Sequence, residues 1–463
     1  MLALYLILAA SPRSLSLKDD GPAHRDVMSA MARSYVNRRT AGWRAYAVHT
    51  PAFARQTGLA CSSCHTHYPE LTATGRAFKL NGYVYLRSDS LQGRNPEGQQ
   101  NLLLNRTVPL SFMVQTSYTS TRKAQPGTKN GTLFLPDQLS LFTGGEVTPH
   151  VGGFLQLTFD PQSGHIGVDN TDFRYANHTT VFGQHTTFGL SLNNNPTVQD
   201  LWNSTPAWGF PYGSSAAAPG PAASTLIDGN LAQQVAGLTG YAMVGNKVYL
   251  EFGGYTSAPL GLNRPLDSTA AGVVRGIAPY WRLAVPMTFG NQYLSIGTYG
   301  MTTQVYPAGV AAPTNRFTDL AADLSYFLPI GANSVTAEAT LIHEWQRWDA
   351  GGSANLRNTL TTFRFDAMYH LGHRYAFTVA PFVTTGTADT LLYAPGVMTG
   401  SRTALPNSSG LIAEVDVMPW QNLRLQLQYT AYRNFNGATT NYDGFGRNAS
   451  HNNTLYFLTW LLF

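Results

Sequence analysis

Apolar and polar residues alternate along most of the chain beyond residue 105. Clear examples are "VGGFLQLTFD" from Val151, "NKVYLEFGGY" from Asn246, "NQYLSIGTYG" from Asn291, "NLRLQLQYTAY" from Asn422 and "NTLYFLTWLLF" at the C-terminus. A period of two residues is typical of β-strands, because successive side chains point to opposite faces of a sheet. We count about sixteen such segments, and each has the length of a tilted membrane-spanning strand, roughly 9 to 11 residues.

The connections between these segments alternate in length. Short turns include "TPH" at Thr148, "FGN" at Phe289 and "LGH" at Leu371, whereas long polar connections begin at Asn193 and Asn434. This alternation is typical of outer-membrane barrels, whose periplasmic turns are short and whose extracellular loops are longer. We therefore predict an all-β fold, a transmembrane up-and-down β-barrel of about sixteen antiparallel strands in the bacterial outer membrane. An even strand number places the N- and C-termini on the periplasmic side.

Composition agrees with a membrane barrel. Charged residues make up 12% of the chain, about half of the roughly 25% usual for soluble domains. The mean hydropathy is only -0.14, and the sequence has no apolar run long enough for a transmembrane helix. A soluble β-sandwich array or β-propeller is the alternative, although no repeat of fixed period supports a propeller. The net charge of +5 comes without a basic cluster interleaved with aromatics, so we expect no nucleic-acid partner.

The texture of the sequence divides the chain into three parts. Residues 1–17 contain "MLALYLILAA", a possible signal peptide or truncated signal that lacks the usual basic start. Residues 18–90 form a short segment that is too small for a large core of its own. Residues 105–463 carry the alternating pattern and are predicted to form the barrel.

The only two cysteines lie in "CSSCH", at Cys61 and Cys64, followed directly by His65. This spacing is the attachment pattern of a c-type haem. Two thiols so placed can form thioethers to the two vinyl groups of the porphyrin, and the histidine then reaches the iron as an axial ligand. The motif predicts one covalently attached haem c held by Cys61, Cys64 and His65, with His65 as the metal ligand.

Three other readings of the cysteine pair remain open. A redox-active dithiol also has the C-x-x-C spacing, but it requires a βαβ context that the flanking sequence does not provide. A zinc site would use the two cysteines with His65 or His67, and a fourth ligand at zinc-finger spacing is missing. A disulfide between Cys61 and Cys64 fits an oxidising compartment but gives His65 no role.

The second axial ligand of the iron is ambiguous. His67 follows His65 too closely to reach the opposite face of the ring. The candidates are His49, Met28, Met31 and Met113. The choice matters because a methionine raises the reduction potential relative to a second histidine.

The run "CSSCHTHYPELTATGRAFKLNGY" from Cys61 resembles the fused outer-membrane monohaem cytochrome c-porins of iron-oxidising bacteria. The likeness extends to the barrel architecture and to the "NNPTVQDLWNSTPAWGFPY" loop. It implies a small N-terminal c-type cytochrome segment, haem on Cys61, Cys64 and His65, extracellular Fe(II) as electron donor and a periplasmic c-type cytochrome as acceptor. The activity it implies is that of an iron(II):cytochrome c oxidoreductase.

We predict that the cytochrome segment plugs the lumen, because one haem on either surface would not bridge a hydrocarbon layer of roughly 25 to 30 Å. Two alternatives are a diffusion porin with a haem-bearing structural plug and electron uptake from a donor other than Fe(II). Asp160, Asp169 and Asp172 are expected at or near one outer loop, as solvated acids rather than iron ligands.

Overall fold

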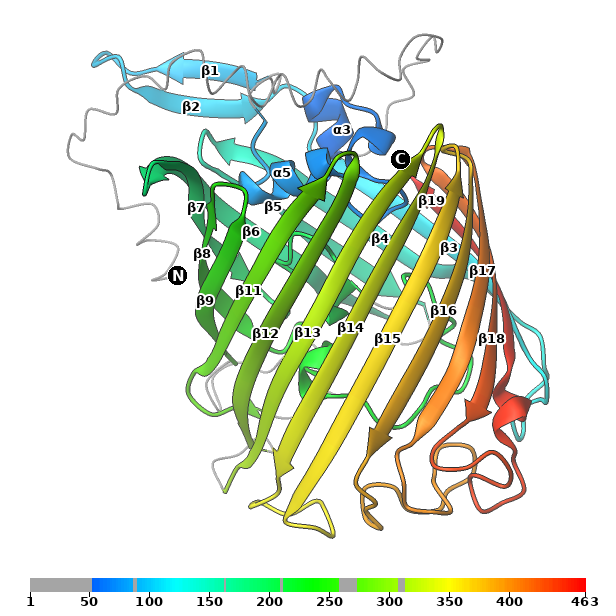
Figure 1. Ribbon diagram of the computed structural model, residues 1–463. Coiled ribbons are helices and arrows are strands. Elements are labelled where there is room, and N and C mark those ends of the chain that lie inside the picture. Colours follow the sequence, from blue (N-terminus) through cyan, green and yellow to red (C-terminus); the bar gives the residue numbers. More distant parts are fainter. Residues whose placement is uncertain (1–51, 86–89, 162–163, 209–210, 258–272, 307–312) are drawn as a thin grey trace. The chain divides into compact units, whose positions relative to one another are not determined.

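The computed structural model describes residues 52–85, 90–161, 164–208, 211–257, 273–306 and 313–463 (Figure 1). The predicted signal at residues 1–17 lies outside the described residues. Within the described ranges, no helix is long and apolar enough to cross a membrane.

Short helices precede a long succession of strands. The helices are α3 (Ala52–Thr57), α4 (Cys61–Cys64) and α5 (Ala73–Leu80), and later helical turns are η1 (Pro206–Trp208), η2 (Leu226–Asn230) and η3 (Ala449–Asn452). The strands are β1 (Ser90–Arg94), β2 (Gln100–Asn105), β3 (Leu110–Thr121), β4 (Thr132–Thr148), β5 (Val151–Asp160), β6 (His165–Val181), β7 (Gln184–Asn193), β8 (Ala236–Val244), β9 (Val248–Thr256), β10 (Val273–Val274), β11 (Ala278–Phe289), β12 (Gln292–Tyr306), β13 (Asn315–Ile330), β14 (Asn333–Arg347), β15 (Arg357–Leu371), β16 (Tyr375–Gly386), β17 (Ser408–Trp420), β18 (Leu423–Asn434) and β19 (Thr454–Leu462).

Sixteen antiparallel strands, β3 to β9 and β11 to β19, close into one barrel. Each strand pairs with its neighbour in sequence, apart from the two-residue strand β10, which pairs with β12. Closure is made where β19 pairs with β3, with Phe457 opposite Tyr118, and where β9 pairs with β11. The predicted all-β barrel and its strand number are confirmed.

The barrel is polar inside and apolar outside. On β18 the buried side chains are Arg424, Gln426 and Gln428, while the intervening Leu427 and Tyr429 are exposed. The other strands follow the same period, because successive residues of a strand point to opposite faces. A soluble barrel would have the opposite polarity, with its apolar side chains inside. A closed barrel with an apolar outer surface is the architecture of bacterial outer-membrane proteins.

The connections differ between the two ends of the barrel (Figure 1). Tight turns lie at the end where the chain terminates, and the positive φ of 61° at Gly290 and at Gly331 is the backbone conformation that such turns require. The longer connections gather at the opposite end, as the alternation of short and long loops predicted.

The barrel begins slightly later than the sequence indicated. Its first strand starts at Leu110, whereas the predicted boundary was residue 105. The hairpin of β1 and β2 lies between the helices and the barrel and pairs only with itself. Of the predicted segment at residues 18–90, the structure describes only residues 52–85 and the first residue of β1.

Phe252 tests the membrane exposure of the outer surface. It lies in the middle of β9 and is 69% exposed. Phe252→Arg should lower the free energy of unfolding in lipid vesicles by about 2 to 4 kcal/mol, because a cation would face hydrocarbon. The control is Leu391→Arg, at a loop residue that is 60% exposed, and it should leave stability nearly unchanged. Equal losses in the two variants would contradict a lipid-facing surface at β9.

Candidate functional site

The cysteine motif forms a single helical turn. The amide of His65 donates a hydrogen bond to the carbonyl oxygen of Cys61 at 2.8 Å, which closes α4. Residues three apart on a helix lie on the same face, so Cys61 and Cys64 present their side chains together. Both are partly buried and are not joined in a disulfide. The turn therefore presents two thiols and an imidazole within five residues.

His65 is held in one orientation by a main-chain acceptor. Its Nδ1 lies 3.1 Å from the carbonyl oxygen of Glu70. A carbonyl only accepts, so Nδ1 carries the proton and Nε2 keeps its lone pair. Burial lowers the pKa of His65 below its ordinary value, which favours the neutral imidazole. A neutral ring whose second nitrogen is hydrogen-bonded is the usual form of a metal-ligating histidine.

The turn is clamped against α5. Thr72 caps α5 by accepting a hydrogen bond from the amide of Gly75, and its own hydroxyl donates to the carbonyl oxygen of Ser63 at 2.6 Å. A Cβ atom at Gly75 would lie 2.3 Å from the carbonyl oxygen of Cys64. Glycine at this position therefore permits the close approach of α4 and α5, which fixes the cysteine turn relative to the next helix.

The structure around the cysteine pair argues against two alternatives to a haem site, a redox-active dithiol and a zinc site. Burial raises the pKa of the Cys64 thiol to about 12, with Cys61 adding to the shift, whereas a redox-active dithiol needs a low-pKa thiolate. In the described part of the chain, three or more potential ligand side chains come together only at His67, Glu414 and Asp416, which includes neither cysteine. A zinc site on the two thiols would therefore lack further ligands.

The N-terminal segment, residues 52–83, bonds to side chains and carbonyls around the barrel wall. Gln56 donates to the carbonyl oxygen of Gly144 on β4 at 2.6 Å. Tyr83 donates to the carboxylate of Asp172 on β6 at 2.7 Å. On the C-terminal strands, Tyr68 donates to a carbonyl of β19 and its own carbonyl accepts from Arg424 of β18. Contacts to strands from both halves of the barrel place this segment against the lumenal face.

Lys79 joins the N-terminal segment to an inward-folded connection. Its side chain is 3% exposed, and its ammonium donates to the carbonyl oxygens of Val198 and Asp200 and to Oδ1 of Asn203. Burial lowers the pKa of Lys79 well below its ordinary value, and Arg174 lowers it further. Asp172, Asp200 and Glu251 act in the opposite direction, and the three acceptors match the three protons of the charged form.

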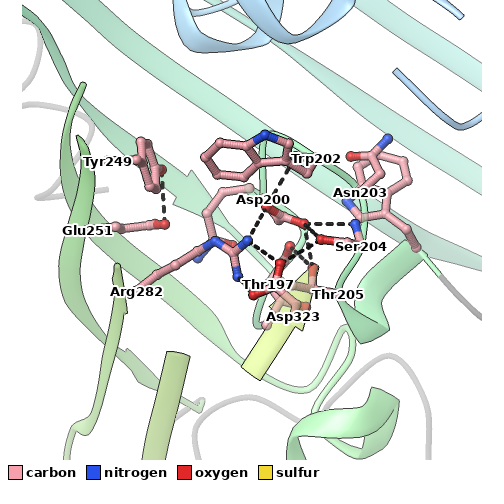
Figure 2. A network of polar contacts seen from close by, with 12 residues as sticks. Thr197, Asp200, Trp202, Asn203, Ser204, Thr205, Tyr249, Glu251, Arg282 and Asp323 are labelled. Atoms are coloured by element: carbon pink, nitrogen blue, oxygen red, sulfur yellow. Dashed lines mark hydrogen bonds and ion pairs between the residues drawn. The ribbon is translucent and has the colours of Figure 1, made fainter. Parts of the chain in front are cut away.

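The acceptors of Lys79 belong to the β7–β8 connection, whose described residues, 194–208 and 211–235, are folded into the barrel (Figure 2). Arg282 of β11 binds Asp200 of this connection at 3.0 Å and Asp323 of β13 at 2.7 Å. The second oxygen of Asp200 accepts from the amide of Ser204 at 3.0 Å and from the hydroxyl of Thr205 at 3.1 Å. One buried arginine thus ties the connection to the wall, and Lys79 ties the N-terminal segment to the connection.

The structure describes only one of the four candidates for the second axial ligand of the iron. His49, Met28 and Met31 lie outside the described residues. Met113 is buried on β3, two residues along the strand from Ser111, whose hydroxyl accepts a hydrogen bond from the amide of Ala52. Met113 as the second axial ligand stays a prediction.

The expectation of solvated acids at or near one outer loop is wrong for Asp172, whereas Asp160 does end β5 beside the β5–β6 connection. Asp169 and Asp172 lie on strand β6 and not in an outer loop. Asp172 is fully buried and binds Arg174 at 2.7 Å as well as Tyr83. A membrane barrel turns the polar side chains of its strands inward, so acids within a strand lie in the lumen.

Sequence reasoning also missed the buried charges that surround the motif. We assigned no role from the sequence to Lys79. The same holds for Arg424 and the two acids that it binds, Glu414 and Asp416. One sequence signal could have identified part of this group. Glu414, Asp416 and Arg424 fall at lumen-facing positions of two strands in which buried and exposed residues alternate. Lys79 and Arg424 also bond across the lumen to residues 119 to 356 positions away in sequence, which alternation does not identify.

Comparisons with known proteins find similar barrels among solved structures. No model of a protein family matches the chain, and no curated protein matches it. Among solved structures, an anion-selective porin from Comamonas acidovorans has a TM-score of 0.46 and 12% identity over 77% of this chain and 99% of its own. Salmonella typhi OmpF, in complex with daunomycin, has a TM-score of 0.45 and 10% identity over 76% of this chain and 97% of its own. The channel DcaP of Acinetobacter baumannii has a TM-score of 0.44 and 12% identity over 76% and 96%.

Lys79→Met tests the link between the N-terminal segment and the connection. Three buried acceptors would lose their donor, and each unsatisfied group costs about 1 to 3 kcal/mol. We expect a loss of at least about 2 kcal/mol in the free energy of unfolding, together with faster protease cleavage within residues 52–83. Lys129→Met removes an exposed lysine from a loop and should change neither measurement. Unchanged stability and cleavage in Lys79→Met would contradict the anchoring role of Lys79.

Proposed function

We propose that this protein transfers electrons across the outer membrane, oxidising extracellular Fe(II) at a single c-type haem and delivering the electron to a periplasmic c-type cytochrome. The observation that carries the proposal is the C-x-x-C-H turn, which contacts Gln421 at the periplasmic end of the barrel and belongs to a segment whose other residues bond to the lumen wall. A haem site placed within the barrel lies on the path between the two sides of the membrane, as electron transfer across it requires.

The residues of the turn fit a haem c. Cys61 and Cys64, one helical turn apart, would form the two thioether bonds, and Nε2 of His65 would ligate the iron. The Glu70 carbonyl fixes the His65 tautomer that this ligation requires. When bound, a haem c supplies a carrier that takes up and releases one electron at a time.

The electron balance of the reaction is simple. Each Fe(II) is oxidised to Fe(III) with loss of one electron, and one oxidised periplasmic cytochrome is reduced. No bond of the protein forms or breaks in the transfer. The N-terminal segment orients the site, and the β7–β8 connection bonds to that segment through Lys79. Oxidation outside the cell also keeps the insoluble Fe(III) product out of the periplasm.

The barrel supports an outer-membrane location. Short turns in this class face the periplasm, and by that rule the C-terminal end of this barrel faces the periplasm. The N-terminal segment bonds to residues near the same end, such as Leu110 at the start of β3. We infer that a periplasmic cytochrome would dock on this side and that Fe(II) would approach from the side of the long loops.

A diffusion porin with a haem-bearing plug is the second candidate function. A porin requires a water-filled passage, whereas the N-terminal segment and residues 194–235 both occupy this lumen and bond to each other through Lys79. The packing argues against free diffusion of solutes.

Haem attachment can be tested directly. Cys61→Ser and Cys64→Ser should each lower the covalently bound haem, measured by the pyridine haemochrome assay on isolated membranes, and should shift the α-band of any haem retained through one thioether. Ser62→Ala lies between the cysteines, preserves the C-x-x-C-H spacing and should retain full haem content. Absence of covalent haem from the unaltered protein would contradict the proposal.

The electron donor is tested with oxidised, purified protein. Added Fe(II) should produce the absorption spectrum of reduced haem, with one Fe(II) consumed per haem, at a pH where the couple is favourable. A chemical reductant such as dithionite serves as the control for a reducible haem. Reduction by dithionite without reduction by Fe(II) would point to a different donor, and rapid solute flux through the protein in liposomes would instead favour the porin.

A further inference from the structure

The barrel contains a cavity beside the N-terminal segment. It has a volume of about 40 Å³ and is lined by residues of the inward-folded connection and of strands β14 to β17. Its polar wall includes Glu338, Asp366, Thr378 and Tyr212. The cavity has room for an ion with a few waters, since one water needs roughly 10 to 15 Å³ of such space.

Two carboxylates face each other across this cavity wall. Glu338 of β14 and Asp366 of β15 are direct cross-strand partners. They are 7% and 8% exposed, so both are more than nine-tenths buried. Like charges directly opposite on neighbouring strands destabilise a sheet, and a buried charge without a partner is costlier still.

Neither carboxylate has a cationic partner in the described part of the protein. Tyr212 donates to one oxygen of Glu338 at 2.8 Å, while Oε1 of Glu338 has no hydrogen-bond partner. No hydrogen bond from a described residue reaches Asp366. The hydroxyl oxygen of Thr378, on the same cavity wall and 8% exposed, is also unpartnered among these residues.

The nearby arginines are already engaged elsewhere. Arg364 lines the cavity but binds Asp228 of the inward-folded connection at 3.1 Å through Nη1. Arg424 binds Glu414 at 2.6 Å and Asp416 at 2.7 Å. The same arginine balances the group of Glu414, Asp416 and His67, which leaves that group a weaker candidate for a metal ion.

A third acid links the carboxylate pair to the cysteine motif. Glu70 is buried, its side chain lies 3.6 Å from the imidazole of His370, and it interacts electrostatically with Glu338 and Asp366. The main-chain carbonyl of Glu70 is the acceptor that orients His65. The residue that positions the proposed haem ligand is therefore next to the unbalanced acids.

We propose that this cavity binds one hydrated divalent cation through the carboxylates of Glu338 and Asp366, with the Thr378 hydroxyl available as a neutral oxygen donor. Carboxylate, hydroxyl and water oxygens suit hard or borderline divalent ions such as Mn(II) and Fe(II). The physiological ion is Fe(II), an identification that rests on the proposed function. Bound there, Fe(II) is held beside the segment that carries His65, and it leaves as Fe(III) after its electron has passed to the periplasmic cytochrome.

Mn(II) tests the cavity independently of electron transfer, because it is not oxidised under these conditions. The full-length protein in detergent is titrated with Mn(II), and the free ion is followed by its electron paramagnetic resonance signal. We expect one bound Mn(II) per chain, weakened at least tenfold in the double variant Glu338→Gln/Asp366→Asn. Fe(II) should compete for the same site under anaerobic conditions.

The matched control removes an equal charge from another cross-strand acid pair of the lumen. Asp319 and Glu344 face each other on β13 and β14 and do not line the cavity, so Asp319→Asn/Glu344→Gln should retain Mn(II) binding. Absence of binding to the unaltered protein, or equal weakening in both double variants, would overturn the proposed site. The heat-modifiable gel mobility typical of membrane barrels checks that each variant is folded.

The two proposals fail in different ways. Mn(II) binding without haem reduction by Fe(II) would overturn the iron-oxidising function but leave the cation site standing. Haem reduction by Fe(II) without Mn(II) binding, and at an unchanged rate in Glu338→Gln/Asp366→Asn, would overturn the cation site and leave the function standing.

Discussion

Because lipid surrounds the closed barrel, the polar side chains of its membrane-spanning strands must face the lumen. Hydrocarbon offers no hydrogen bonds, so the strands must pair with one another into a closed cylinder and turn their apolar residues outward. With a period of two, the remaining side chains of each strand face the lumen. The barrel interior is therefore lined with arginines, carboxylates and amides, and any segment that enters it must satisfy them.

The N-terminal segment and the β7–β8 connection meet this requirement together. Asp200 neutralises part of the charge of Arg282, and the backbone of the same connection supplies acceptors to Lys79. Buried ion pairs of this kind contribute little net stability, but removing one partner leaves an uncompensated charge. The arrangement therefore specifies where the segment sits more than it raises the overall stability of the barrel.

The same constraint applies to buried acids of the lumen that have no cationic partner. Most buried acids of the lumen have a cationic or hydrogen-bonding partner, as Asp172 has in Arg174 and Tyr83. Glu338 and Asp366 face each other without such a cation and open onto a cavity. This is the arrangement from which we propose a cation site, since burying such acids without a partner is costly. The main-chain carbonyl of Glu70 orients His65 and its side chain interacts with Asp366, so this residue joins the proposed haem ligand to the proposed cation site.

The sequence by itself determined the barrel, its sixteen strands and the alternation of its turns, because lipid outside and polar groups inside impose a period that can be read from neighbouring residues. It also supplied the C-x-x-C-H spacing from which we propose covalent haem attachment, since that pattern lies within five adjacent residues. It did not determine that Asp172 is a buried partner of Tyr83, that Lys79 holds the inward-folded connection, or that Glu338 opposes Asp366. Those relations join residues 28 to 124 positions apart, and only closure of the barrel sets the register and depth that bring them together.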